Sequence, residues 1–180
     1  MISIRSKITR KILEYFFLNP HARHYVNELA RMFSVDPKNL HKKLEALERE
    51  GLLLSEFSGK QRYFSLREHY PLLKEYRAII FKTSLERRLK DILLRIPGVA
   101  SAYLFGSYVR GNMDAASDID MLVVGNHSIA ALQKELNVLQ KETGREINAV
   151  QMSEKEFLKK RKKGNPFLVR ILKKEHIQLV

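Results

Sequence analysis

Two short motifs in the second half of the chain have the residue types that phosphate and metal chemistry requires. Gly106 and Ser107 follow the apolar stretch 99–105, and Asp118 and Asp120 lead into another apolar stretch. Backbone N–H groups at the start of a helix bind phosphate, and a glycine leaves them uncovered. Two carboxylates two residues apart in a strand project from one face and repel each other unless a cation such as Mg²⁺ lies between them. This combination predicts nucleotidyl transfer from a nucleoside triphosphate.

The string GSYVRG followed by SDIDMLVV resembles the nucleotidyltransferase superfamily of DNA polymerase beta, and within it the minimal nucleotidyltransferase branch. The resemblance covers about residues 98–157. It implies an α+β domain, a small mixed sheet with flanking helices, that uses Mg²⁺ and a nucleoside triphosphate such as ATP. It also implies that Gly106 and Ser107 contact the phosphates, while Asp118 and Asp120 hold the metal and carry the catalysis.

Arg110 lies in the same motif and has two interpretations. In the first, its guanidinium binds a phosphate of the nucleotide or holds the phosphate-binding loop in place. In the second, it forms a surface ion pair with Asp114. We therefore include Arg110 among the predicted nucleotide-binding residues together with Gly106 and Ser107.

One position departs from the family pattern. The family usually places a third acidic residue on a later strand, and in the corresponding stretch 147–150 the residue at that position is Asn148. In active members the third carboxylate holds the catalytic metal and takes the proton from the attacking hydroxyl. A neutral amide offers one oxygen to Mg²⁺ but is no base at neutral pH. Glu146, two residues earlier on the same face, is the alternative acid, so whether turnover survives stays open.

The N-terminal segment predicts three helices followed by a hairpin, and a tight turn joins the second and third of these helices. Apolar residues recur at helical spacing over residues 8–17, 26–33 and 40–47, whereas 52–57 and 62–66 are typical of two strands joined by a basic turn. Over roughly the first 66 residues this segment resembles the winged helix-turn-helix of many prokaryotic transcription regulators.

The second helix of such a pair enters the major groove of DNA, where Asn pairs with adenine and Lys meets guanine or phosphate. Hairpin cations contact phosphate or the minor groove. Arg31 is a further phosphate candidate. The alternative is that this basic surface docks a protein or is merely solvated. The predicted DNA-binding residues are Lys38, Asn39, His41, Lys42 and Lys43 on the helix, with Lys60 and Arg62 on the hairpin.

Composition favours a polyanionic partner. The chain has 180 residues and a net charge of +13, from 33 Lys and Arg against 20 Asp and Glu. The first 96 residues carry 20 of those cations and 11 of those acids. The absence of Cys excludes a disulfide scaffold and Cys-ligated zinc, and the six His have no ligand-like spacing. No stretch reads as a signal peptide or membrane span, so we expect a cytoplasmic protein without membrane contact.

We expect two small domains. A mainly α winged helix-turn-helix domain covers residues 1–70, and an α+β nucleotidyltransferase-like domain with a basic C-terminal region covers 97–180. A helical connector over 71–96 joins them, and its apolar faces would suit a homodimer contact. The basic run 159–163 is a solvated helix face, an extension of a nucleic-acid surface, or a segment that reaches toward the phosphates of a substrate.

Three functions fit these observations. The first is an enzyme that uses Asp118 and Asp120 to transfer a nucleotidyl group to an acceptor that the sequence does not identify. The second is a regulator that binds double-stranded DNA and senses a nucleoside triphosphate without turnover, which Asn148 favours. The third is an antitoxin-like protein with a protein partner, which the minimal nucleotidyltransferase resemblance implies.

Overall fold

The computed structural model describes residues 4–111 and 117–180, so Asp114 lies outside the described residues. The chain forms two compact units, one of residues 1–85 with 141–144 and the other of residues 86–140 with 145–180. The segment 71–96, expected to connect two domains, falls on both sides of this division. Of the helices in the described ranges, none combines the length and the apolar character needed to cross a membrane.

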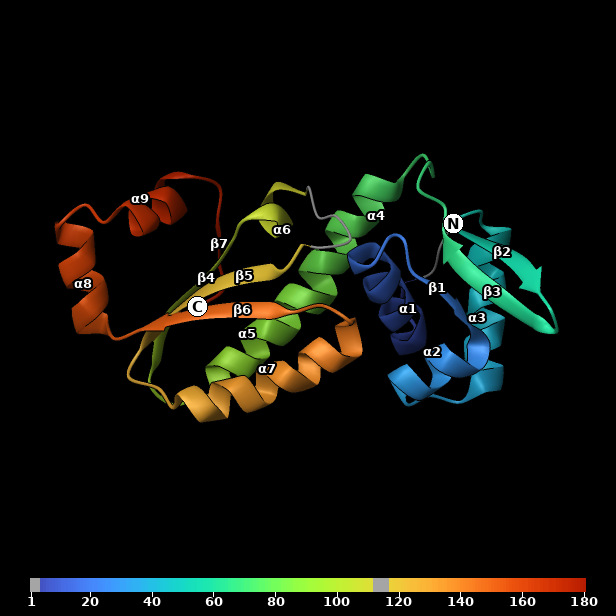
Figure 1. Cartoon of the computed structure of the whole chain (residues 1–180), viewed down its shortest axis with the longest axis horizontal. Helices are drawn as coiled ribbons and strands as arrows, with labels where there is room; N and C mark the ends of the chain where they lie inside the picture. Colours follow the sequence, from blue (N-terminus) through green and yellow to red (C-terminus); the bar gives the residue numbers. More distant parts are fainter. Residues whose placement is uncertain (1–3, 112–116) are drawn as a thin grey trace. The chain divides into compact units, whose positions relative to one another are not determined.

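The N-terminal unit combines helices with a small antiparallel sheet of strand order β1-β3-β2 (Figure 1). The predicted helical stretches bury their apolar residues, including Phe16, Leu29 and Leu44, which are fully inaccessible. Its elements in chain order are α1 (Lys7–Leu18), β1 (Arg23–Tyr25), α2 (Val26–Phe33), α3 (Pro37–Arg49), β2 (Leu53–Ser58), β3 (Gln61–Leu66), α4 (Leu73–Ile80) and η1, a π-helical turn (Phe81–Leu85).

Local side chains set the tight turn between α2 and α3. Ser34 ends α2 in the left-handed conformation, with φ 52°. The Asp36 carboxylate then accepts a hydrogen bond from the Asn39 N–H at 2.8 Å. Pro37 begins α3, where its missing N–H costs nothing. The two helices are therefore joined by a few residues, as the sequence predicts, and the β2–β3 hairpin follows.

The C-terminal unit is an α+β domain around a mixed sheet of strand order β6-β5-β4-β7. Strands β5 and β6 run parallel, whereas β4 is antiparallel to both β5 and β7. This confirms the expected small mixed sheet with flanking helices. The elements are α5 (Glu86–Arg95), β4 (Val99–Phe105), α6 (Ser107–Arg110), β5 (Ile119–Gly125), α7 (Ile129–Thr143), β6 (Ile147–Met152), α8 (Glu154–Lys162), α9 (Pro166–Lys173) and β7 (Ile177–Gln178).

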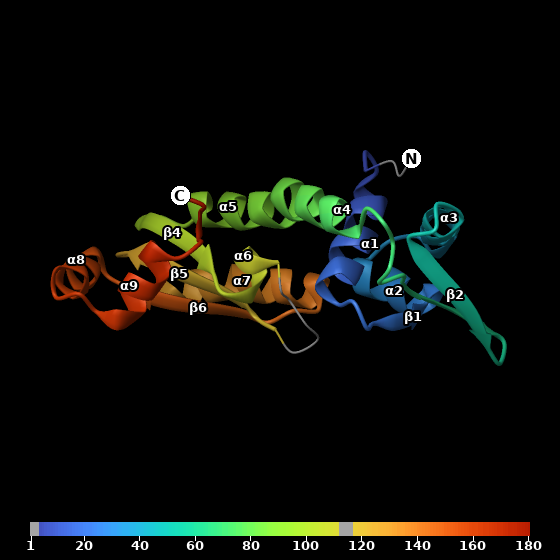
Figure 2. The ribbon, with the colours of Figure 1, turned by 90° about the horizontal axis from the view of Figure 1, so that it is seen from above.

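Alternation along the strands divides the sheet of this unit into two faces. Ile119 and Met121 of β5 are fully buried on one face, as the sequence predicts. Leu122 and Val124 lie on the other face, which also carries the Asp120 side chain. The apolar residues of this second face pack with Leu168 and other residues of α8 and α9. Figure 2 shows α8 and α9 beside the sheet, at one end of the strands, so the Asp120 face is partly covered by the C-terminal helices.

Candidate nucleotide-binding site

The site begins where β4 ends at Gly106. This residue has φ +80° and ψ −149°, a combination that is essentially restricted to glycine. A Cβ built at Gly106 would lie 2.5 Å from Oδ2 of Asp120, far inside van der Waals contact. The Gly-Ser motif and the second acid of the Asp-x-Asp motif are therefore in direct contact. Ser107 follows as the first residue of α6.

We expect Gly106→Ala to lower the free energy of unfolding by about 2 kcal/mol, mainly because its φ and ψ are strained for any residue other than glycine; the Asp120 carboxylate must also move aside. Gly111→Ala is the matched control. Gly111 also has a positive φ, +69°, but a Cβ there meets nothing within 4 Å, so we expect a loss of about 1 kcal/mol. Urea unfolding of the two variants measures the difference. Equal losses would show that the contact with Asp120 is unimportant for folding.

The two acids lie at the start of β5 and interact electrostatically. Asp118 immediately precedes the strand and is exposed, whereas Asp120 is half-buried. Burial is the largest influence on Asp120 and raises the pKa of its carboxyl, and the negative charge of Asp118 raises it further. A hydrogen bond from Asn148 and the charges of Arg170 and Arg110 act in the opposite direction on that pKa. A bound cation would relieve the repulsion between the two carboxylates.

Asn148 lies directly beside Asp120, because the parallel pairing of β5 with β6 places these two residues opposite each other. The Asn148 Nδ2 donates a hydrogen bond to Oδ1 of Asp120 at 3.4 Å. Glu146, the alternative acid, precedes β6 and is exposed, and its carbonyl oxygen accepts the Ile119 N–H at 2.9 Å. The position predicted for a third acid is thus occupied by an amide in contact with the second acid.

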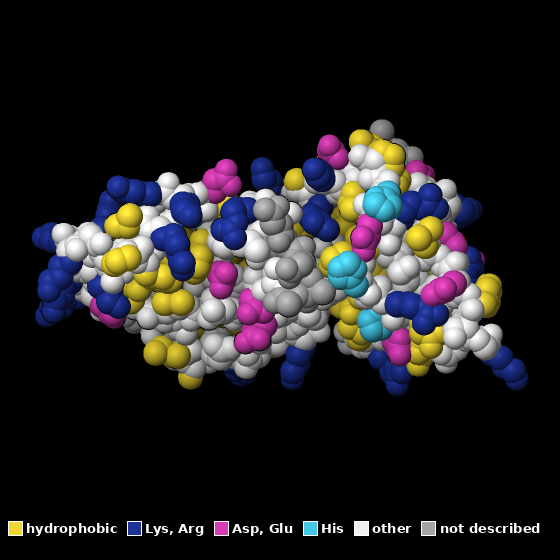
Figure 3. Space-filling view, turned by 45° about the horizontal axis from the view of Figure 1, so that its top comes forward, with side chains coloured by type: hydrophobic (Ala, Val, Ile, Leu, Met, Phe, Trp, Pro, Cys, Tyr) yellow, Lys and Arg dark blue, Asp and Glu magenta, His cyan; other side chains and the backbone are white. Residues whose placement is uncertain are grey.

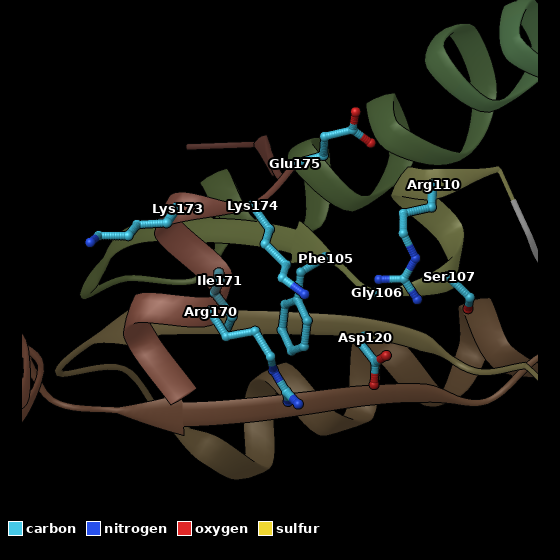
Figure 4. Close-up of a pocket in the computed structure, with 10 residues that line it drawn as sticks. All are labelled: Phe105, Gly106, Ser107, Arg110, Asp120, Arg170, Ile171, Lys173, Lys174 and Glu175. Carbon is cyan, nitrogen blue, oxygen red and sulfur yellow. The ribbon is translucent and has the colours of Figure 1, made fainter. Parts of the chain in front are cut away.

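A cavity of about 950 Å³ opens beside Gly106, Ser107 and Asp120 (Figure 4), whereas Asp118 and Asn148 are not among the residues that line it. One wall comes from the end of β4 and from α6, and the opposite wall comes from α9 and the residues just after it. The α9 wall was not predicted from the sequence. The basic run 159–163, for which contact with substrate phosphates was one interpretation, does not line the cavity. The lining residues are Phe105, Gly106, Ser107, Arg110, Asp120, Arg170, Ile171, Lys173, Lys174 and Glu175.

Comparison with protein families decides what this domain is. Residues 86–179 match the nucleotidyltransferase domain family. The chain belongs to this family. No curated protein matches the chain. The matched region, residues 86–179, extends further in both directions along the chain than the stretch of about 98–157 that carries the resemblance. It also includes α5 and the elements from α8 to β7.

Three side chains at this site carry oxygen atoms that Mg²⁺ could use: Asp118, Asp120 and Asn148. They fit the ion only if phosphate completes its coordination. In the part of the chain that the structure describes, no group of three or more His, Asp or Glu side chains could hold a metal ion. Asp118 and Asp120 nevertheless supply two carboxylates, and Asn148 could supply an amide oxygen if its amide were reversed. Mg²⁺ in such sites commonly takes one or two carboxylates and completes its coordination with substrate phosphates and water.

The predicted DNA-binding residues of the N-terminal unit differ in their surroundings. Lys38, Asn39 and Lys42 are exposed on α3, and Lys60 is exposed in the turn between β2 and β3. Lys43 is half-buried. His41 is half-buried too, and its Nε2 lies 3.7 Å from Oε1 of Glu45. Arg31, which the sequence suggested as a further phosphate contact, is exposed. Its guanidinium donates to the Asn27 carbonyl and to the Tyr25 hydroxyl.

Arg62 has a different environment from the exposed lysines. Its Nη2 lies 2.6 Å from Oε2 of Glu48, and its Nε donates to the Ser55 hydroxyl at 2.9 Å. The hydrogen bond from Ser55, followed by the Arg62 interactions, lowers the pKa of the Glu48 carboxyl despite the opposing effect of burial. Arg62 Nη1 also lies 3.5 Å from Oε1 of Glu45. Arg62 therefore ties the hairpin to α3, a role that sequence reasoning missed because Glu45 and Glu48 come from a different element.

Proposed function

We propose that the nucleotidyltransferase domain binds a nucleoside triphosphate with Mg²⁺ and transfers its nucleotidyl group slowly, if an acceptor is supplied. The observation that carries this proposal is the contact between Gly106 and Asp120, which brings the phosphate-binding motif and the metal-binding motif together at one cavity. Membership of the family supports the same chemistry.

Each residue of the site has a role in this proposal. Backbone N–H groups at Gly106 and Ser107, with the Ser107 hydroxyl, bind phosphate oxygens, and Arg110 neutralises part of the phosphate charge. Asp118 and Asp120 hold the metal. When bound, Mg²⁺ would neutralise charge that develops on the phosphates during transfer.

Asn148 sets the limit on turnover. Transfer forms a bond from an acceptor hydroxyl oxygen to the α-phosphorus, breaks the bond to the oxygen that bridges to the β-phosphorus, and releases pyrophosphate. The hydroxyl proton must be taken up by a base, and an amide accepts no proton at neutral pH. We therefore expect nucleotide binding to be retained better than catalysis.

Calorimetric titration tests the binding step. We expect at least one of the four ribonucleoside triphosphates to bind the wild type with Mg²⁺, and the Asp118→Asn/Asp120→Asn variant to bind it at least about tenfold more weakly, because two charged ligands are lost. The control, Asp91→Asn/Glu154→Gln, removes two exposed acids outside the cavity and should bind as the wild type does. If no triphosphate binds the wild type, the proposal is wrong.

We also propose that the N-terminal unit binds double-stranded DNA. The observation in favour is that exposed Lys38 and Lys42 near the start of α3 and exposed Lys60 at the hairpin turn belong to one compact unit. Arg62 supports their arrangement, because its contact with Glu48 fixes the hairpin against α3. Docking of an acidic protein on the same lysines is the competing function.

A further inference from the structure

The cavity of the nucleotidyltransferase domain has more positive than negative side chains. Arg110, Arg170, Lys173 and Lys174 line it against the carboxylates of Asp120 and Glu175. In Figure 4 the Glu175 carboxylate points away from Asp120. A metal ion bound at Asp120 would offset the negative charge of that carboxylate. The four cations of the lining would then have to be neutralised by the ligand. The cavity is therefore suited to a ligand with several negative charges.

Helix α9 is held so that its cations face this cavity. The Asn165 side chain caps the helix by accepting the N–H groups of Phe167 and Leu168 at 3.1 and 3.3 Å. Leu168 and Ile171 are 1 % and 2 % exposed within the apolar cluster of the domain, so this side of the helix is fixed to the sheet. The position of its polar side is consequently determined by the core.

Arg170 and Lys174 are the cations of this wall that are directed toward the acids. Arg170 lies in the last turn of α9 and Lys174 is the first residue after it, and both line the cavity. Figure 4 shows both side chains extending toward Phe105 and Asp120, whereas Lys173 extends away. The charge of Arg170 is close enough to favour the ionised form of Asp120. Among the residues that the structure describes, neither cation forms an ion pair.

We propose that Arg170 and Lys174 bind the terminal phosphates of the nucleotide, so that the cavity selects triphosphates over monophosphates. This inference rests on the proposed nucleotide-binding function. Gly106, Ser107 and Asp120 lie on the side of the cavity opposite α9. A single phosphate bound there needs no contact with the α9 wall, whereas a triphosphate chain extends across the cavity and brings its remaining charge to Arg170 and Lys174.

The test uses inorganic tripolyphosphate and orthophosphate as probes, with a chelator to remove Mg²⁺. Calorimetry compares the wild type with Arg170→Gln/Lys174→Gln, which keeps much of the aliphatic part of both side chains. We expect the affinity of this variant for tripolyphosphate to fall by about ten- to a hundredfold and its affinity for orthophosphate to change by less than about threefold. Unchanged tripolyphosphate affinity would overturn the inference.

Lys162→Gln/Lys163→Gln is the matched control, because it also removes two exposed cations and these lie outside the cavity. The control should bind tripolyphosphate as the wild type does. An equal loss in both double variants would show a general effect of net charge and would also overturn the inference. Thermal unfolding of both variants checks that the fold is retained, and Lys174→Gln alone, at an exposed position, serves if Arg170 proves necessary for folding.

A second comparison separates this inference from the proposed function. Magnesium-dependent triphosphate binding that is lost in Asp118→Asn/Asp120→Asn but unchanged in Arg170→Gln/Lys174→Gln would overturn the role of α9 and leave the proposed function standing. Tripolyphosphate binding that depends on α9, in a protein that binds no nucleoside triphosphate, would overturn the proposed function. The α9 wall would then be a polyphosphate site alone.

Discussion

Replacing Asn148 with Asp is expected to raise nucleotidyl transfer by about 10²- to 10⁴-fold, the usual contribution of a general base. The pairing of β5 with β6 already places this position beside Asp120, so the new carboxylate would lie next to the Asp120 carboxylate without a change of backbone. It would add a carboxylate to the proposed metal site and a group that accepts the proton of the attacking hydroxyl. Transfer of α-³²P from each labelled ribonucleoside triphosphate to the protein itself, to RNA and to total cell protein measures the effect.

Two controls accompany this measurement. Asn148→Ala removes the amide without adding a base and should give no gain. Asn148→Asp combined with Asp120→Asn restores the number of carboxylates found in the wild type and should lose the gain. A folded Asn148→Asp protein without increased transfer would show that the amide does not limit the reaction, and would shift attention to Glu146 or to the acceptor.

DNA binding by the N-terminal unit is expected to weaken about a hundredfold between 50 and 200 mM salt if Lys38, Lys42, Lys43 and Lys60 each neutralise one phosphate. Lys42→Glu should weaken binding at low salt by at least about tenfold and make the salt dependence less steep, because one contact is replaced by repulsion. Fluorescence anisotropy with labelled genomic fragments gives both the affinity and its salt dependence.

Lys74→Glu provides the control for this charge reversal. Lys74 is exposed on α4 of the same unit, outside α3 and the hairpin. Its replacement by Glu changes the net charge by the same amount as Lys42→Glu. Figure 3 shows that Lys and Arg side chains also gather at the end of the nucleotidyltransferase domain where α8 lies, so controls of this kind are needed. Salt-independent binding, or no binding to any fragment, would favour protein docking on α3.

The central part of the site could be predicted from sequence because its geometry is local. Gly106 directly follows β4 and Asp120 lies on the adjacent antiparallel strand β5, with only thirteen residues between them in the sequence. Each motif ends or begins a strongly apolar strand. The place of Asn148 was predicted from the family pattern, which usually has a third acid on this later strand, and the observed register pairs Asn148 with Asp120. The strand alternation then fixes which residues face the cavity.

The α9 wall and the contacts of Arg62 could not be predicted in the same way. Arg170 lies on the basic helix α9 and Lys174 directly follows it. The apolar residues Leu168 and Ile171 of this helix were the signal that one side is buried. Local sequence does not say against which sheet face such a helix packs. Strand β1 is similarly determined by distant residues, because its three residues pair with β3 across the unit, Tyr25 opposite Tyr63.

The core that α9 shares with the sheet also sets the smallest length at which the domain can be isolated. A fragment ending near residue 157 would keep Asp118, Asp120 and Asn148, the residues of the proposed metal site, yet it would uncover Leu122 and Val124. It would also lose the backbone hydrogen bond from the Ala102 N–H to the Val180 carbonyl at 3.3 Å and with it the β7 edge of the sheet. Such a fragment should aggregate, so that isolation, crystallisation or grafting of this domain requires the chain through Val180.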